Sequence, residues 1–326
     1  MKHIIIGGDG LVGSHLTKLL QGKELDCLVV DLKHENRGKV YRENTSHMAA
    51  DITDRDALDT IPFESNDIVY NLAARQYHNA IPSKDIQPWF NEVNVNGCRN
   101  VLEAMEKKNC SQHVYFSTDM VYGLPQRLPV DTEHPKNPIG EYGESKRISE
   151  EICQTFRNKG MQITILRPRL ILGPGRLGVL IKLFRLIQKG LPVPLIGNGS
   201  NVYQMVSVFD CAAAAHLAAE AGLPNKAFNL GSANPPKVID LMRDIIKIAG
   251  TRSFVLKTPA PLTKGALSVL GMCGIRLLQK EQYSLADQQY IVDIEDTRRD
   301  LGWEPVYNDR DMLMEAYQYF VNLNRL

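Results

Sequence analysis

Short apolar runs alternate with longer amphipathic stretches along most of the chain. The apolar runs have the length of buried strands and lie at 4–6, 27–30, 48–50, 67–72, 113–116 and 228–230. Apolar residues recur at helical spacing between and after them, at 11–20, 86–108, 142–159, 178–189, 210–220, 238–249 and 311–322. Strands that alternate with helices predict a parallel sheet that is covered by helices on both faces.

Three glycines follow the first apolar run at three-residue spacing. Gly7 would let the chain turn sharply off the strand, Gly10 would let the backbone approach a pyrophosphate, and Gly13 would let the next helix pack closely on the sheet. The N–H groups near Leu11 and Val12 lie at the positive end of that helix, which favours phosphate oxygens. The stretch therefore predicts a dinucleotide-binding turn.

An acidic residue, Asp31, ends the second apolar run. Its carboxylate would accept hydrogen bonds from the ribose hydroxyls of an adenosine and would repel a 2′-phosphate, which favours NAD over NADP. Lys33 and Arg37 follow closely, and their positive charges work against this preference. We expect NAD as the cofactor.

Candidate cofactor-binding residues also follow the next three strands, at the edge where doubly wound sheets bind ligands. Asp51 and Ile52 either flank the adenine or form a turn that caps the helix beginning near Asp54. Small residues after the fourth strand leave room for a cofactor, and polar residues after the fifth would face the nicotinamide and the substrate. These positions are Leu72, Ala73 and Ala74 after the fourth strand, and Ser117 and Thr118 after the fifth.

A tyrosine and a lysine lie four residues apart in YGESK, at the start of a predicted helix. The spacing places Tyr142 and Lys146 on one helical face. A free tyrosine is too weakly acidic to act as a base at neutral pH, but a nearby ammonium group favours the phenolate. Such pairs are also common on solvated helix faces. Downstream of a dinucleotide-binding turn, the pair predicts a tyrosine that takes a proton from a substrate hydroxyl.

These patterns predict an α/β fold, a Rossmann-type doubly wound parallel sheet with a smaller C-terminal substrate-binding lobe. We place the NAD-binding domain at 1–168, with 204–230 returning to it. The lobe would be built from 169–203 and 231–326.

The composition narrows the class of protein further. Lys and Arg total 38 against 37 acidic residues, a net charge of +1, which gives no reason to expect a nucleic acid as partner. The 6 cysteines show no CxxC pair and no metal-ligand spacing, so we expect reduced thiols, no metal site and a cytoplasmic protein. The first strand begins at once, leaving no room for a signal peptide, and no apolar run is long enough to span a membrane.

Several motifs together resemble the extended short-chain dehydrogenase/reductase family, in its NAD-dependent epimerase/dehydratase branch. They cover nearly the whole chain and are highly specific for the family, but not for a substrate. They are IGGDGLVG at the start, NLAA at 71–74, NVNG at 94–97, FSTDMVYG at 116–123, YGESK at 142–146, LRPRLILGPG at 166–175, FNLGS at 228–232 and RRDLGWEP at 298–305.

The resemblance implies a role for each matching residue. Tyr142 would be the catalytic base and acid, and Lys146 would hold the nicotinamide ribose and lower the pKa of the tyrosine. Thr118 would bind the substrate hydroxyl. Asn94 would order the helix and the surroundings of the lysine, and the backbone of Pro168 would pass beside the nicotinamide.

One departure from the family concerns the reaction. Sugar 4,6-dehydratases of this branch have an aspartate and a glutamate, as acid and base, where this chain has Asp119 and Met120. A thioether cannot take a proton from C5 of a sugar, which argues against dehydratase activity. We therefore interpret Asp119 as a structural carboxylate at a strand end.

Two further departures concern the carrier of the sugar. Enzymes acting on soluble nucleotide sugars usually have an asparagine where this chain has Leu170, and a diphosphate-binding arginine where it has Tyr203. Arg176, Lys182 or Arg276 would compensate if they reached the diphosphate. The alternative is that these three are ordinary solvated charges.

This pattern is similar to a subgroup of bacterial epimerases in surface-polysaccharide assembly, some of which act on sugars attached to a polyprenyl diphosphate. The segment 258–278 has few charges and many Leu, Val, Met and Gly residues. We favour a buried helix of the substrate lobe for this segment. The alternative is a stretch that lies against a membrane or a lipid tail.

The resemblance favours an NAD-dependent epimerase of a nucleotide- or polyprenyl-diphosphate-linked sugar, acting at C4 through a transient keto-sugar. One alternative is a net oxidoreductase of the same fold, such as a keto-sugar reductase or a hydroxysteroid-type dehydrogenase. Another is a non-catalytic NAD-binding regulator, which would be expected to lose Tyr142 or Lys146. A homodimer through the helices near 86–108 and 141–159 is also expected.

Overall fold

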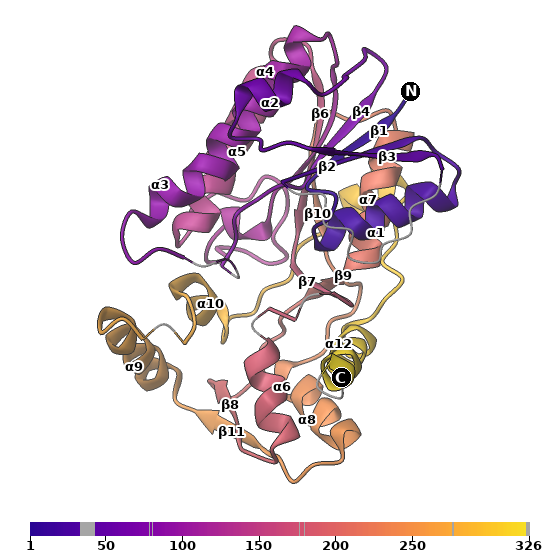
Figure 1. Cartoon of the computed structure of the whole chain (residues 1–326). Helices are drawn as coiled ribbons and strands as arrows, with labels where there is room; N and C mark the ends of the chain where they lie inside the picture. Colours follow the sequence, from indigo (N-terminus) through magenta and orange to yellow (C-terminus); the bar gives the residue numbers. More distant parts are fainter. Residues whose placement is uncertain are drawn as a thin grey trace.

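A seven-stranded parallel sheet forms the centre of the molecule (Figure 1), in the order β10–β6–β5–β4–β1–β2–β3. The computed structural model describes residues 1–32, 43–77, 79, 81–175, 177–178, 180–275 and 277–323. The central strand β1 (His3–Ile6) pairs with β2 (Cys27–Asp31) on one side and β4 (Ile68–Asn71) on the other. The strand order reverses here, so the carboxyl ends of β1 and β4 open a crevice for a ligand. The predicted doubly wound sheet is confirmed.

Helices cover both faces of this sheet. The other strands are β3 (Thr45–Ala49), β5 (Gln112–Phe116), β6 (Gln162–Pro168) and β10 (Ala227–Leu230). One face packs against α1 (Leu11–Gly22), α7 (Val208–Glu220) and α11 (Glu295–Leu301). The other face packs against α2 (Arg55–Asp59), α4 (Cys98–Lys107) and α5 (Glu141–Arg157). The strands are apolar on both faces because each face is buried.

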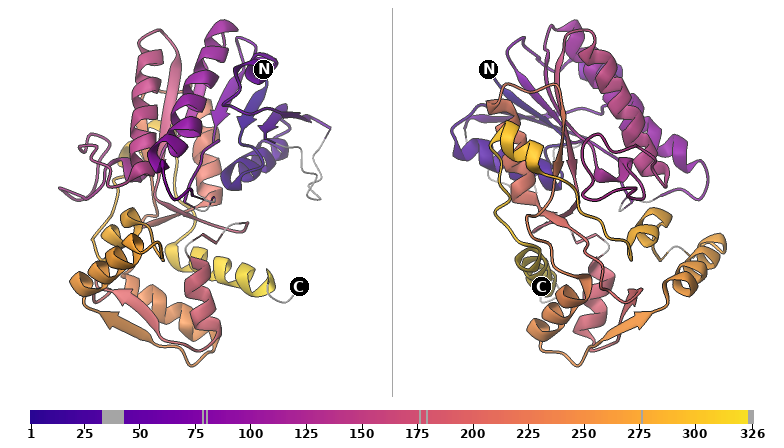
Figure 2. Two further views of the ribbon diagram at one scale, coloured as in Figure 1. Left: turned by 60° about the vertical axis from the view of Figure 1, so that its left-hand side comes forward. Right: turned by 180° about the vertical axis from the view of Figure 1, so that it is seen from behind.

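A smaller lobe lies beyond the carboxyl ends of the strands, and Figure 2 shows it below the sheet in two further views. Its core packs side chains of α6 (Leu180–Gln188), β8 (Val193–Ile196), α8 (Val238–Ala249) and α12 (Asp309–Leu323). β8 pairs with β11 (Val255–Thr258), and β7 (Leu170–Leu172) pairs with β9 (Met205–Ser207). Two further helices, α9 (Ala260–Met272) and α10 (Lys280–Leu285), follow β11.

The last part of the chain returns to the sheet before it ends in the lobe. Tyr290, Val292, Leu301 and Trp303 are buried in the same cluster as α1 and α7. The Trp303 indole N–H donates to the Asp210 carbonyl at 2.9 Å. The division of the chain at residue 168 stays a prediction, and this packing adds a second return of the chain to the sheet.

The long helical region expected over 86–108 is confirmed, and it consists of α3 (Ile86–Asn91), a π-helical segment η1 (Glu92–Gly97) and α4. One expectation about helices is wrong. The stretch 258–278 is not a buried helix, since none of the described residues of α9 is buried. None of the helices in the described part of the chain is long and apolar enough to cross a bilayer.

Candidate active site

The glycine turn after β1 leaves no room for side chains. Gly7 has φ +80°, and a Cβ there would lie 2.7 Å from the Ala73 nitrogen. A Cβ on Gly13 would lie 2.3 Å from the Gly7 carbonyl oxygen. Gly10 is the N-cap of α1 and has no side chain to cover the free N–H groups of Leu11 and Val12. The turn therefore fits the pyrophosphate of a dinucleotide, as the three-residue spacing predicts.

The Asp31 carboxylate lies at the end of β2, beside this turn. It accepts hydrogen bonds from the backbone N–H groups of Asp9 at 2.9 Å and Leu32 at 2.8 Å. These two bonds orient the carboxylate at the sheet edge, where a ribose would lie. Lys33 and Arg37, which work against the preference for NAD, lie outside the described residues.

The residues after β3 are divided between a turn and the core. Asp51 is exposed and accepts hydrogen bonds from the N–H and the hydroxyl of Thr53, both at 2.8 Å. Asp54 caps α2 by accepting from Asp56 and Ala57. Ile52 is buried, and a Cβ on Gly97 would lie 2.5 Å from its Cδ1. Its position beside an adenine stays a prediction.

Leu72, Ala73 and Ala74, which are half-buried, follow β4 and lie beside the glycine turn. The next residues lead to the predicted base. Gln76 Nε2 donates to the Tyr142 hydroxyl at 3.3 Å, and the Tyr77 ring lies 5.8 Å from the Tyr142 ring. Sequence analysis missed both contacts, because the loop after β4 carries no distinctive spacing.

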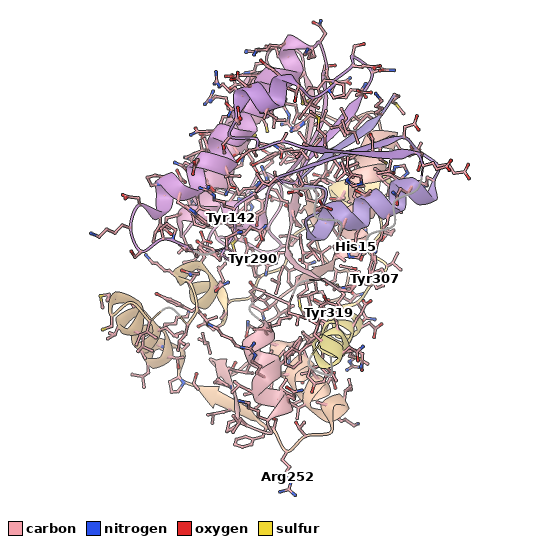
Figure 3. All side chains as sticks on the ribbon, viewed as in Figure 1. His15, Tyr142, Arg252, Tyr290, Tyr307 and Tyr319 are labelled. Atoms are coloured by element: carbon pink, nitrogen blue, oxygen red, sulfur yellow. The ribbon has the colours of Figure 1, made fainter. Side chains whose placement is uncertain are left out.

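Tyr142 lies in the first turn of α5 and is buried. Its ring packs between those of Tyr77 and Phe90, both at 5.8 Å between centroids. Figure 3 shows Tyr142 on the side of the sheet domain that faces the lobe, near Tyr290. The two rings fix the direction of the phenol, so that its hydroxyl stays at the sheet edge.

Lys146 lies one turn further along α5 and is buried as well. Its ammonium donates to the Tyr115 hydroxyl at 2.8 Å. Burial lowers the pKa of this ammonium to about 8. The cost of burying the charge thus leaves the lysine close to its titration point at physiological pH.

Asn94 connects the loop after β4 to α5. Its amide oxygen accepts from the Arg75 N–H at 2.8 Å, and its amide nitrogen donates to the Ser145 hydroxyl at 2.9 Å. The Ser149 hydroxyl donates to its backbone carbonyl at 2.7 Å. Asn94 lies in the π-helical segment η1, and such segments often occur at functional sites. These bonds connect η1 to α5, and the role of Asn94 in the surroundings of Lys146 stays a prediction.

The two hydroxyl residues after β5 have different neighbours. Ser117 donates to Glu150 at 2.6 Å, and Glu150 is paired with Arg167 at 2.8 Å. Burial raises the pKa of Glu150, but Arg167 and Lys136 outweigh it and hold this pKa at about 2. Ser117 therefore joins a buried ion pair next to Pro168. Its contact with the cofactor stays a prediction.

Thr118 is buried at the N-terminus of the short 3-10 helix η2 (Asp119–Val121), which packs on α5. Its hydroxyl accepts from the Met120 N–H at 3.3 Å. This packing brings Thr118 to the helix that carries Tyr142 and Lys146. The three predicted catalytic residues thus lie on two elements in contact.

A buried cation that sequence analysis missed lies beyond Thr118. Arg169 is paired with Asp119, and its guanidinium lies 3.9 Å from the centre of the Tyr290 ring and 4.5 Å from that of Tyr203. The Tyr290 hydroxyl donates to the Asp119 carbonyl at 3.0 Å. The second arginine of the sequence RPR at 167–169 could have indicated this cluster. Its aromatic partners Tyr203 and Tyr290 come from distant segments, so sequence spacing could not identify them.

The lobe contributes a second residue that sequence analysis missed. Glu281 of α10 is buried, and its Oε1 accepts from the Gly143 N–H in the first turn of α5 at 3.0 Å. Burial raises the pKa of this carboxyl to about 7, although the bond from Gly143 and the Tyr77 hydroxyl lower it. Glu281 therefore links the lobe to the helix of Tyr142.

The three cations considered for a diphosphate are only partly described. Arg176 and Arg276 lie outside the described residues. Lys182 is exposed and donates to the Leu277 carbonyl at 2.8 Å. Leu170 and Tyr203 are half-buried. Over the described ranges no group of three or more His, Cys, Asp or Glu residues could hold a metal ion.

Comparison with known proteins gives consistent matches. The sequence model of the NAD dependent epimerase/dehydratase family matches residues 3–231. A putative UDP-glucose 4-epimerase of Methanocaldococcus jannaschii is 28% identical over 99% of both chains. An N-acetyl-alpha-D-glucosaminyl-diphospho-ditrans,octacis-undecaprenol 4-epimerase of Escherichia coli O157:H7 is 33% identical over 63% of this chain and 59% of its own length.

A solved structure matches over the whole chain. It is a UDP-glucose 4-epimerase of Thermotoga maritima with UDP-glucose, 25% identical, with a TM-score of 0.78 over 99% of this chain and 100% of its own. The sequence and structure matches confirm the resemblance that the motifs indicate.

Proposed function

Because the chain belongs to the NAD-dependent epimerase/dehydratase family, with NAD as its cofactor, we propose that it epimerises an activated sugar at C4. The observation that carries the proposal is the contact between η2 and α5, which brings Thr118, the N-cap of η2, to the helix of Tyr142 and Lys146. The glycine turn follows β1 and Thr118 follows β5, at the carboxyl edge of the same parallel sheet, which supports a common site. A non-catalytic binding protein would have no need of it.

Each site residue has a proposed role in proton transfer. Thr118 orients the sugar hydroxyl, and Tyr142 takes its proton and later returns it. Lys146, when charged, favours the phenolate form of the tyrosine. A bound NAD would supply the hydride acceptor and donor for the sugar carbon. The site must leave room for the keto-sugar to rotate, so that the hydride is returned to the opposite face of the sugar.

Dehydration is not part of this proposal. Asp119 is held by Arg169 in a buried ion pair, so its carboxyl is poorly placed to protonate a leaving hydroxyl. Met120 offers no base at all. A carboxylate held by a guanidinium acts as a hydrogen-bond acceptor, which supports a structural role for Asp119.

The sugar carrier is proposed as a nucleotide or a polyprenyl diphosphate. The relatives include one that acts on an undecaprenol-linked sugar and another described as a UDP-glucose epimerase. Tyr203, which replaces the usual diphosphate-binding arginine, packs on Arg169 instead. We propose that the enzyme acts in polysaccharide assembly, with peripheral membrane contact through 258–278 where the substrate is lipid-linked.

The test compares two substrates. The purified protein is incubated with UDP-N-acetylglucosamine or with its polyprenyl-diphosphate counterpart, and C4 epimers and NADH are measured. We expect an epimer without net NADH. Tyr142→Phe should lower the rate by about 10²–10⁴-fold while NAD still binds. Tyr319→Phe, a half-buried tyrosine of the lobe, is the matched control and should change little.

Two outcomes would contradict the proposal. Stoichiometric NADH with a ketone product would assign the enzyme to the net oxidoreductases. Full activity of Tyr142→Phe would remove the tyrosine from the chemistry.

A further inference from the structure

Two segments of the lobe contain no acidic residue. Residues 169–203 carry five Lys or Arg, and residues 245–280 carry six, whereas neither contains an Asp or a Glu. Over the whole chain the two signs nearly cancel, with 38 basic and 37 acidic residues. The acidic residues of the lobe lie elsewhere, for example Asp240 and Asp244 in α8 and Asp311 in α12. The positive charge of the lobe is therefore concentrated in these two segments.

Several of these cations are free to meet a partner. Lys247, Arg252, Lys257 and Lys280 are exposed, and within the described ranges none of the four takes part in an ion pair. Lys264 of α9 is instead paired with Asp287 at 2.5 Å. In Figure 3, Arg252 extends away from the body of the molecule at the end of the lobe.

Large apolar side chains lie among these cations. Leu262 and Met272, at opposite ends of α9, are 74% and 78% exposed. Val269 of the same helix is exposed, and so are Phe254 and Leu256 on the neighbouring strand segment. An apolar helix normally buries one face in a protein core, whereas none of the residues of this helix is fully buried. Exposed apolar side chains gathered in this way are typical of an interaction surface.

These features share one side of the lobe. α9 follows β11 directly, and β11 pairs with β8. In the views of Figures 1 and 2, α9 lies at the outer margin of the lobe beside α10, and the β8–β11 pair lies towards the end of the lobe that is distant from the sheet. We call the exposed surface of residues 252–272 the outer lobe face.

We propose that the outer lobe face docks on the surface of an anionic lipid bilayer. Apolar side chains flanked by cations match the acyl boundary and the anionic head groups of such a surface. A second copy of this chain fits less well, because two such faces would bring like charges together. The docking proposal depends on the proposed function in one respect only: docking would bring a lipid-linked sugar to the active site.

Binding to vesicles tests the docking directly, without substrate. The full-length protein is mixed with vesicles of phosphatidylcholine alone or with phosphatidylglycerol added, and the bound fraction is measured by sedimentation. We expect binding that rises with the anionic lipid content and falls with added salt. Arg252→Gln with Lys257→Gln should weaken binding by about fivefold for each cation removed.

A matched set of variants separates the two contributions. Leu262→Ser with Met272→Ser should lower the bound fraction about tenfold or more, because exposed apolar area is lost. The control is Val306→Ser with Lys18→Gln, which changes an 81% exposed apolar residue and an exposed lysine that both lie outside the outer lobe face. This control should bind like the unchanged protein.

The outcomes are distinct from those of the epimerase assay. No binding to anionic vesicles at low salt would overturn the docking proposal, even if the enzyme epimerises a soluble sugar. Equal loss of binding in the control variant would also overturn it. If the unchanged protein forms an oligomer and Leu262→Ser dissociates it, the outer lobe face binds a second copy of the chain instead of a bilayer. Vesicle binding without epimerase activity would leave the docking intact and overturn the proposed function alone.

Discussion

At the scale of single residues, Thr118 and Asp119 are neighbours in the chain and both are buried, but their side chains have different partners. Asp119 directly follows Thr118, yet its carboxylate is turned into a cluster with Arg169 and Tyr290. A buried charge is tolerated only where another charge and polar contacts compensate its loss of hydration. Here the Arg169 guanidinium compensates the Asp119 carboxylate, and the rings of Tyr203 and Tyr290 lie over the guanidinium.

Removing one member of this pair should destabilise the protein strongly. We expect Arg169→Met to lower the free energy of unfolding by about 3–5 kcal/mol, because Asp119 is left charged and unpaired. Asp119→Asn should cost less when it is added to the Arg169→Met variant than when it is made alone. Urea unfolding of the two single variants and the double variant measures this coupling. Additive effects of the two substitutions would show that the pair does not act as a unit.

At the scale of elements, the catalytic helix α5 is fixed from both sides. Asn94 of η1 binds Ser145 from the sheet domain, and Glu281 of α10 binds Gly143 from the lobe. The Glu281 contact joins residues 138 positions apart in the chain. The position of Tyr142 thus depends on the lobe as well as on the sheet.

Titration of Glu281 should make the contact between α10 and α5, and with it the stability of the protein, depend on pH. Its pKa rises on folding from 4.5 to about 7, so the folded state holds the proton more tightly than the unfolded state. The free energy of unfolding should therefore fall as the pH rises from about 4.5 to 7, and Glu281→Gln should remove this loss. Burial lowers the pKa of His3 to about 4, so this residue makes the free energy of unfolding rise with pH. This effect is the same in the unchanged protein and in Glu281→Gln.

The difference in the free energy of unfolding between Glu281→Gln and the unchanged protein therefore reports the contribution of the Glu281 carboxyl alone. Chemical denaturation at several pH values between about 4.5 and 8 measures it. Glu315→Gln, which changes an exposed glutamate of α12, is the control and should parallel the unchanged protein. A constant difference between Glu281→Gln and the unchanged protein at every pH would contradict the prediction.

Local patterns predicted the cofactor end of the site better than the substrate end. Gly7, Gly10, Gly13 and Asp31 lie within one strand–helix–strand unit, so their spacing along the chain fixes their positions in space. Arg169 and Glu281 act through partners more than a hundred positions away, or through rings from other segments. The π-helical segment was missed because Asn94 serves a tertiary contact that helical spacing does not record.

At the scale of the whole molecule, we propose a homodimer through the outer faces of α4 and α5. These helices cover one face of the sheet, and in Figure 1 α9 lies below them on the same side of the molecule. Sedimentation velocity should give a dimer that Arg99→Glu, an exposed charge of α4, weakens. Lys18→Glu on α1 is the control, and a monomer for the unchanged protein would refute the proposal.

The second return of the chain to the sheet has a consequence for synthesis. Trp303 fills the core between α7 and β10, and its indole binds the Asp210 carbonyl. β1 begins at His3, whereas Trp303 of the same core comes late in the sequence. On the ribosome, this part of the core forms only after residue 303 has emerged. A chain stalled before residue 303 would therefore expose the side of the sheet that this tryptophan covers.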